Sequence, residues 1–237
     1  MKQTIFIFLI SLIYSCVFAQ ESNQTPNETQ TNIKIEKREV GTYNKVKTTK
    51  GINVTLVEGD KESIEIHIQN GEPSDVITEL NGKTLTLKMR TRIYKDMAVQ
   101  VYVTYKELIE IEAGVGSSID CDGAIIADRI TLNAGSDASI EIELYAKSVE
   151  ANLSACRIEL SGSTDYQEIK ASAATYNALE FKSKEAYVKA NTGAKVNIHV
   201  TDKLDATATT GSKIYYRGNP GNIEKNATLG GKIEPVE

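Results

Sequence analysis

Two aspartates are the first residues in this chain whose types and spacing allow a defined chemistry. Asp120 and Asp122 flank Cys121, and side chains two residues apart in an extended strand point to the same side. Clustered carboxylates hold Ca²⁺, and a basic residue beside them can abstract a proton from a sugar. The neighbouring repeat offers Asn133 and Asp137 but no stacked row of carboxylates. We therefore interpret Asp120 and Asp122 as acidic residues on a solvated face, with a calcium or sugar site as the alternative.

Three glutamates continue this acidic character along the chain. Glu141, Glu143 and Glu159 fall on the polar phase of two alternating segments. Carboxylates stacked about 5 Å apart on adjacent strands repel each other unless a cation intervenes. Arg157 and Lys147 are near enough in sequence to neutralise them. We therefore predict salt-paired surface groups and no metal site.

The sequence offers no set of catalytic residues. His67 and His199 lie far apart, each among strand-forming residues, and no serine or cysteine has a histidine at a suitable spacing. No Gly-Lys-Ser/Thr loop follows a strand. We predict no catalytic residue, no cofactor and no enzymatic activity. The alternative is a carbohydrate-active lyase or hydrolase, or a calcium-dependent protein, that uses Asp120, Asp122 and nearby carboxylates.

Tyrosines are the stronger candidates for contact with a ligand. The chain has 11 tyrosines and no tryptophan, and exposed aromatic faces stack on sugar rings or fill pockets of a partner protein. Tyr215 and Tyr216 are adjacent, so in a strand their side chains point to opposite faces. The candidate ligand-binding residues are therefore Tyr215, Tyr216, Asp120 and Asp122. Stacking of the tyrosines between neighbouring strands is the alternative.

These residues belong to a repeat that runs from about residue 108 to the C-terminus. Segments that alternate apolar and polar residues recur about every 20 residues. Their central apolar residues are Ile119, Ile140, Ile158, Leu179, Val196, Ile214 and Ile233. A period near 20 is typical of stacked coils, none of which buries its apolar face alone. Alternation at period two with many β-branched residues favours strands over helices.

Small residues at regular positions predict how each coil turns. Glycine, alanine or serine precedes each apolar centre, as in Ala134-Gly135-Ser136 and Thr210-Gly211-Ser212. Such residues allow backbones to approach closely and adopt left-handed dihedral angles. Each coil is therefore expected to hold two short strands separated by a tight corner. The sequence predicts an all-β, single-stranded parallel β-helix (β-solenoid), with regular coils over residues 107–237 and a charged terminal coil as a cap.

Residues 33–106 form a less regular, strand-rich part in this prediction. Asn81-Gly82 lies between two strand-like segments and is a strong hairpin signal. Pro73-Ser74-Asp75 is suited to start one helical turn. Because no linker is visible near residue 105, we expect residues 33–237 to form a single domain.

The N-terminus predicts export. Residues 1–19 have a positive start, an apolar segment and a Val-Phe-Ala end typical of a signal peptide cleaved after Ala19. Lipid attachment at Cys16 is the less favoured alternative, because Tyr14 fits a lipidation motif poorly. Residues 20–32 are polar and predict a flexible tether. No later segment is apolar enough for a membrane helix, and a net charge of −5 argues against nucleic-acid binding.

The two cysteines after the signal peptide are predicted to be free thiols. Cys121 and Cys156 lie two repeats apart and at different phases of the repeat. Two coils separate their backbones by about 9.6 Å, and a disulfide needs Cα atoms within about 7 Å. We therefore expect both to act as small, mostly buried hydrophobic residues.

One segment carries a specific family resemblance. Residues 51–60 read GINVTLVEGD and are followed by SIEI at Ser63–Ile66. Together with NGKTL at Asn81–Leu85 and IYYRGNP at Ile214–Pro220, they resemble the head GIN domain family of auto-transporter adhesins. The resemblance covers about residues 40–233. It implies a right-handed β-helix and a role in adhesion.

The sequence as a whole indicates an exported, non-enzymatic binding protein. Its expected partners are a protein or a glycan of the cell envelope, reached in the periplasm, at the outer-membrane surface or outside the cell. A structural envelope protein that self-associates is a further alternative, so an oligomer stays open.

Overall fold

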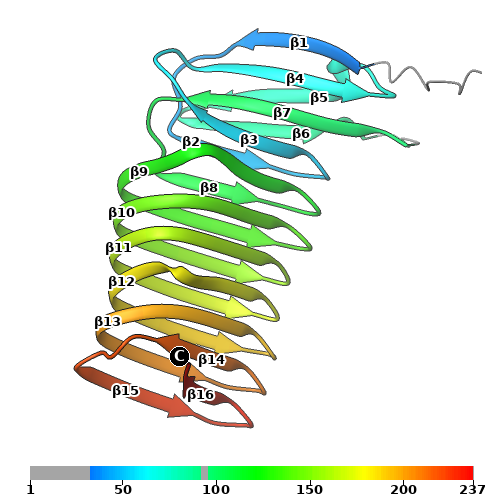
Figure 1. Cartoon of the computed structure of the whole chain (residues 1–237). Coiled ribbons are helices and arrows are strands. Elements are labelled where there is room, and N and C mark those ends of the chain that lie inside the picture. The colour runs from blue at the N-terminus through cyan, green and yellow to red at the C-terminus, as the bar shows by residue number, and fades with distance from the viewer. Residues whose placement is uncertain (1–32, 92–95, 237) are drawn as a thin grey trace, which may run out of the picture. The chain divides into compact units, whose positions relative to one another are not determined.

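The computed structural model describes residues 33–91 and 96–236 (Figure 1). They form one sheet of 16 strands. The predicted signal peptide (1–19), the predicted tether (20–32) and Cys16 lie outside the described residues. Within the described ranges no helix is long and apolar enough to cross a membrane.

Five long strands form the regular coils. Each pairs in parallel with the next one along the chain. They are β9 (Ser118–Gly135), β10 (Ser139–Ser154), β11 (Arg157–Ser172), β12 (Thr175–Asn191) and β13 (Lys195–Ala208). The prediction of an all-β parallel β-solenoid is confirmed, because each coil bonds to the coils on either side of it.

Eight shorter strands precede β9, and most of them lie above the coils in Figure 1. They are β1 (Ile33–Glu39), β2 (Lys45–Thr48), β3 (Asn53–Glu58), β4 (Ser63–Gln69), β5 (Val76–Asn81), β6 (Thr84–Met89), β7 (Ala98–Tyr105) and β8 (Glu110–Ala113). Only the pairs β1–β4, β4–β7 and β5–β6 are antiparallel, so this part is less regular, as predicted. The hairpin at Asn81-Gly82 is confirmed between β5 and β6, and Pro73–Asp75 forms one 3₁₀ turn.

Three short strands end the solenoid. β14 (Lys213–Arg217) and β16 (Lys232–Pro235) follow β13 on one side, and β15 (Asn222–Ala227) pairs with β13 on the other. Lys225 of β15 lies over the ring of Tyr216, with its Nζ 4.5 Å from the ring centroid and 2.7 Å from the hydroxyl. A charged side chain that covers the end of the core disfavours pairing with another strand. This contact supports a capping role for the terminal coil.

The expectation of two short strands per coil is corrected by the structure. Each regular coil is one long strand that bends, because its hydrogen-bond ladder to the neighbouring coils continues past the bend. In β11 the bend lies at Gly162, where φ is 107°. The bend creates two flat sides. The first flank comprises β3, β7, the beginnings of β9–β13, β14 and β16; the second comprises β2, β6, β8, the ends of β9–β13, and β15.

The core lies between the two flanks and follows the predicted alternation. Most of the predicted apolar centres are fully buried, namely Ile119, Ile140, Ile158, Val196 and Ile214. Ile233, in the terminal coil, and Leu179 are only half-buried. Tyr176 takes the place of Leu179, since it lies in register between Ile158 and Val196 and is 0% exposed. The prediction was wrong at this coil because an irregularity in β12 shifts the alternation.

The tight corners between coils adopt left-handed backbone angles, as their small residues predicted. Gly116, Gly193 and Gly211 have φ of 63°, 72° and 73°. Non-glycine residues also adopt such angles, with φ of 52° at Ser136 and 50° at Ala155. Successive corners bond to each other, for example through the amide of Ser136 and the carbonyl of Ser154 at 3.0 Å. The corners therefore hold the coils in register.

Candidate functional site

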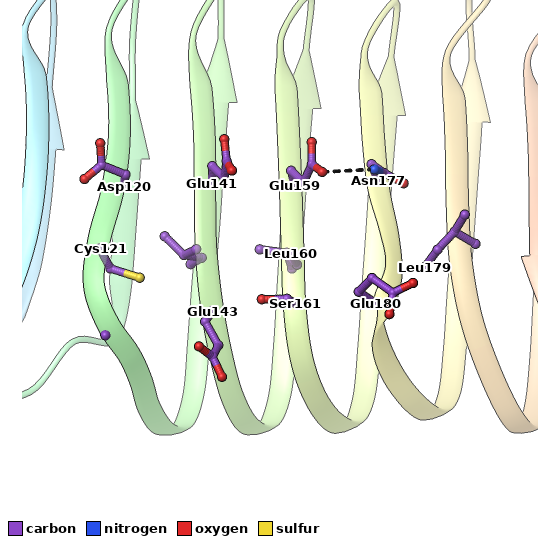
Figure 2. A pocket seen from close by; sticks show the side chains of 12 residues that line it. Asp120, Cys121, Glu141, Glu143, Glu159, Leu160, Ser161, Asn177, Leu179 and Glu180 are labelled. Carbon is purple, nitrogen blue, oxygen red and sulfur yellow. Dashed lines mark hydrogen bonds between the residues drawn. The ribbon is translucent and has the colours of Figure 1, made fainter.

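A pocket of about 490 Å³ opens on the first flank across β9, β10, β11 and β12 (Figure 2). It contains most of the carboxylates singled out in the sequence. The pocket is lined by Asp120, Cys121, Gly123, Glu141, Ile142, Glu143, Glu159, Leu160, Ser161, Asn177, Leu179 and Glu180.

Two β-bulges bracket this pocket. Asp120 and Ala124 of β9 are four residues apart, but their partners in β10, Glu141 and Glu143, are only two residues apart. At the other end of the pocket, Asn177 and Glu180 of β12 are three residues apart, but their partners in β11 are only two residues apart. A bulge bends its strand and redirects side chains, and bulges are common beside functional sites. The pocket lies between the two bulged strands, with the regular β10 and β11 between them.

The carboxylates form a row across neighbouring coils. Asp120, Glu141 and Glu159 are in register, and Asn177 follows them; Figure 2 shows them side by side along the row. Glu159 accepts hydrogen bonds from Arg157 at 2.6 Å and from Asn177 at 3.3 Å. The predicted pairing of Arg157 is therefore confirmed.

The predicted pairing of Lys147 with the glutamates is wrong. Lys147 forms an ion pair with Asp128 at 2.7 Å instead. Within residues 33–91 and 96–236, neither Asp120 nor Glu141 has a basic partner within ion-pair distance. These two carboxylates are therefore available to a ligand.

No cluster of three or more histidine, cysteine or acidic residues that could hold a metal ion occurs in the described part of the chain. The carboxylates of the pocket follow the flank in a line. Ca²⁺ instead takes six to eight oxygen ligands gathered around it. The geometry thus favours hydrogen bonding to a ligand over metal binding.

Cys121 and Cys156 are both free, as predicted. Cys156 is buried as expected, whereas Cys121 lies in the pocket and is only half-buried. Burial raises the pKa of the Cys121 thiol, and the negative charges of Asp120, Glu143 and Asp122 raise it further. A protonated thiol is a poor nucleophile. Cys121 therefore contributes a weakly polar surface rather than covalent chemistry.

The other predicted site residues are divided between surface and core. Asp122 is exposed beside the pocket but does not line it. Tyr215 is half-exposed on the first flank, whereas Tyr216 points inward and is 5% exposed. The prediction that the two tyrosines face opposite sides is confirmed. Tyr216 is held in the core, so Tyr215 is the one that faces solvent.

A further tyrosine, not among the predicted site residues, lies near the pocket. Tyr145 is 44% exposed and lies in register with Ile126, which is 77% exposed. Its hydroxyl donates a hydrogen bond to Glu143 Oε1 at 2.9 Å, and this bond raises the pKa of the phenol. Both residues lie at the bend, where strict alternation no longer predicts which side chains are buried.

His199 has no catalytic partner in this arrangement. It pairs in register with Arg217, and burial together with the positive charge of Arg217 lowers its pKa. The ring is therefore mainly neutral at pH 7. His67 lies in the N-terminal part, with its ring 2.7 Å from Glu65 Oε1.

The comparison with protein families matches residues 42–220 to the model described as "Putative auto-transporter adhesin, head GIN domain". The chain belongs to this family. The match includes the GINVTLVEGD segment and most of the first-flank strands that line the pocket. No curated protein matches the sequence.

Two solved structures of similar fold are described as adhesins, and a third is described as a lipid binding protein. A "putative adhesin" from Bacteroides fragilis superposes with a TM-score of 0.77 at 15% identity, covering 86% of this chain and 97% of that one. A "putative adhesin" from Parabacteroides distasonis gives 0.71 at 16%, covering 87% and 98%. A "putative lipid binding protein" from the same species gives 0.68 at 17%, covering 87% and 98%. At these identities the likeness shows a shared fold alone.

Proposed function

We propose that this head GIN domain is a cell-surface adhesion protein that binds an envelope glycan or protein through its first flank. The observation that carries the proposal is the pocket between the two bulged strands β9 and β12. Family membership supports an adhesive role. The solenoid supports it as well, because its corner and strand hydrogen bonds make a preorganised surface.

The side chains of the pocket suit a hydroxyl-rich ligand. Asp120 and Glu141 are acceptors without basic partners among the described residues. Carboxylates accept strong hydrogen bonds from hydroxyl or ammonium groups. Tyr145 at the bend and Tyr215 farther along the flank supply exposed aromatic surface, on which sugar rings stack. No enzymatic step is part of this proposal.

Neutralising the carboxylate row is expected to weaken binding. In D120N/E141Q/E159Q each acceptor loses its charge with little change in shape. Because hydrogen bonds to charged groups are stronger than neutral ones, affinity should fall about tenfold or more. The measurement is binding of the purified chain to an array of neutral and amino-sugar glycans and to solubilised envelope proteins.

A matched control removes the same charge from the other side of the solenoid. Glu150 and Glu168 are in register on the second flank, and Asp205 lies in the same row two coils beyond Glu168. The variant E150Q/E168Q/D205N should bind like the unaltered chain. If both triple variants lost affinity equally, or if the unaltered chain bound no ligand, the proposal that the pocket binds the ligand would be contradicted.

Export is the second part of the proposal, and it rests on residues 1–19 of the sequence. We expect the mature chain to begin at Gln20. Intact-mass measurement of the chain from its native envelope tests this directly. A mass that includes an acylated Cys16 would instead support a lipid anchor.

A further inference from the structure

Three lysines from different coils form a ladder on the first flank. Lys195 of β13 is in register with Lys213 of β14, and Lys213 is in register with Lys232 of β16. All three are exposed. Neighbouring strands lie about 4.8 Å apart, so the chain places one positive charge per coil along a line at the C-terminal part of this flank.

The lysine ladder has no neutralising partner. Across residues 33–91 and 96–236, none of the three ammonium groups lies within 4.0 Å of a carboxylate. By contrast, Lys170 on the second flank pairs with both Glu150 and Glu168. Like charges directly opposite each other on adjacent strands destabilise a sheet. The fold therefore maintains a repulsion that a bound anion would relieve.

An aromatic side chain lies beside the ladder. Tyr215 is two residues beyond Lys213 on the same face of β14, and Lys195 Nζ is 5.9 Å from the centroid of its ring. Asn197 of β13 and Glu234 of β16 are in register with Tyr215 on its two sides. Asn197 adds a neutral hydrogen-bonding group, and Glu234 places one carboxylate at the C-terminal edge of this surface. A ring face, an amide and a line of ammonium groups together match a charged sugar better than an isolated ion.

We propose that the lysine ladder binds a linear polyanionic glycan that runs along the stack of coils. Its carboxylate or sulfate groups would pair with Lys195, Lys213 and Lys232, and one of its rings would stack on Tyr215. This inference rests on the proposed binding role of the first flank, but it uses residues outside the pocket. It names a ligand class for the C-terminal part of that flank.

The geometry favours a glycan over two other anionic partners. A flat membrane surface would also meet Asp120, Glu141 and Glu159 on the same flank, and these repel anionic lipid. In an extended acidic peptide, side chains on one face repeat about every 6.8 Å, which does not match the coil spacing of about 4.8 Å. A charged glycan also offers a ring face to Tyr215, which an acidic peptide side chain does not.

The test measures binding of polygalacturonate, with neutral dextran as the reference polymer. The unaltered chain should bind polygalacturonate and not dextran, and the affinity should fall as salt is raised, because exposed charge pairs are screened. K195Q/K213Q/K232Q should lose about tenfold or more in affinity. The matched control K83Q/K106Q/K189Q removes three scattered, exposed lysines and should bind nearly as well as the unaltered chain.

A second readout separates the ladder from simple folding defects. Without ligand, K195Q/K213Q/K232Q should melt at the same or a higher temperature than the unaltered chain at low salt, since the repulsion is removed. No binding of polygalacturonate by the unaltered chain would overturn the inference. Equal loss in the ladder and control variants would also overturn it, as would a preference for anionic vesicles or polyglutamate.

The inference about the lysine ladder and the proposal about the pocket can be tested separately. If D120N/E141Q/E159Q still binds polygalacturonate, the ladder acts independently of the pocket, as we infer. If that variant loses polygalacturonate binding while the ladder variant keeps it, the ligand lies in the pocket and the ladder inference is wrong.

Discussion

Replacing Gly162 by alanine should lower the free energy of unfolding by about 3 kcal/mol. Gly162 lies at the bend of β11 with a φ of 107°, a conformation that residues with a side chain rarely adopt. A Cβ atom there would come within 2.2 Å of the carbonyl oxygen of Leu144 in β10. The backbones of the two coils must therefore separate, which weakens the ladder on both sides of the bend.

Gly221 supplies the matched control for this substitution. A Cβ atom at Gly221 would have no heavy atom within 4 Å, so Gly221→Ala should change stability by no more than about 0.5 kcal/mol. Urea unfolding of both variants, followed by far-ultraviolet circular dichroism, gives the two values. Similar values for Gly162→Ala and Gly221→Ala would show that the bend does not need glycine.

Tyr176→Ala should have an effect of similar size, about 4 kcal/mol. Tyr176 is fully buried at the level of the pocket. Its hydroxyl donates to Gln167 Oε1 at 2.9 Å, Gln167 Nε2 donates to Ser183 Oγ at 2.7 Å, and Ser183 Oγ donates to the carbonyl of His199 at 2.9 Å. Truncation would leave a cavity and an unpaired oxygen on Gln167.

Tyr176→Phe separates the hydrogen bond from the packing. It keeps the ring but leaves the buried Gln167 oxygen without its donor, which should cost about 1–3 kcal/mol. Tyr215→Phe on the surface should cost close to nothing and serves as the control. Thermal unfolding of the three variants checks the order. A Tyr176→Phe protein as stable as the unaltered chain would show that water satisfies Gln167.

Much of the fold could be predicted because each coil of the solenoid repeats the same pattern of apolar and small residues. Alternating residues defined the buried face, and small residues marked the corners. Leu179 was misassigned because the bulge in β12 shifts the alternation, so that Tyr176 occupies the buried register position instead. The sequence predicted two short strands per coil because the alternation of apolar and polar residues stops at each bend. The backbone pairing nevertheless continues through the bend, so each coil is one long strand.

The candidate site was only partly predictable. The period of two placed Asp120, Glu141 and Glu159 on one face, but the pocket depends on bulges, which appear only when two strands are compared in register. The lysine ladder was hidden for a related reason. Lys195, Lys213 and Lys232 lie in separate repeats of an acidic chain, and only the coil register shows that they are neighbours.

The central claim is that the first flank binds an envelope ligand without altering it. The most direct measurement is hydrogen–deuterium exchange on the purified chain, with and without envelope polysaccharide, combined with an assay for new reducing ends. The account predicts protection confined to the first-flank segments of β9–β14 and β16 and an unchanged polysaccharide. Protection on the second flank, or the appearance of new reducing ends, would contradict it.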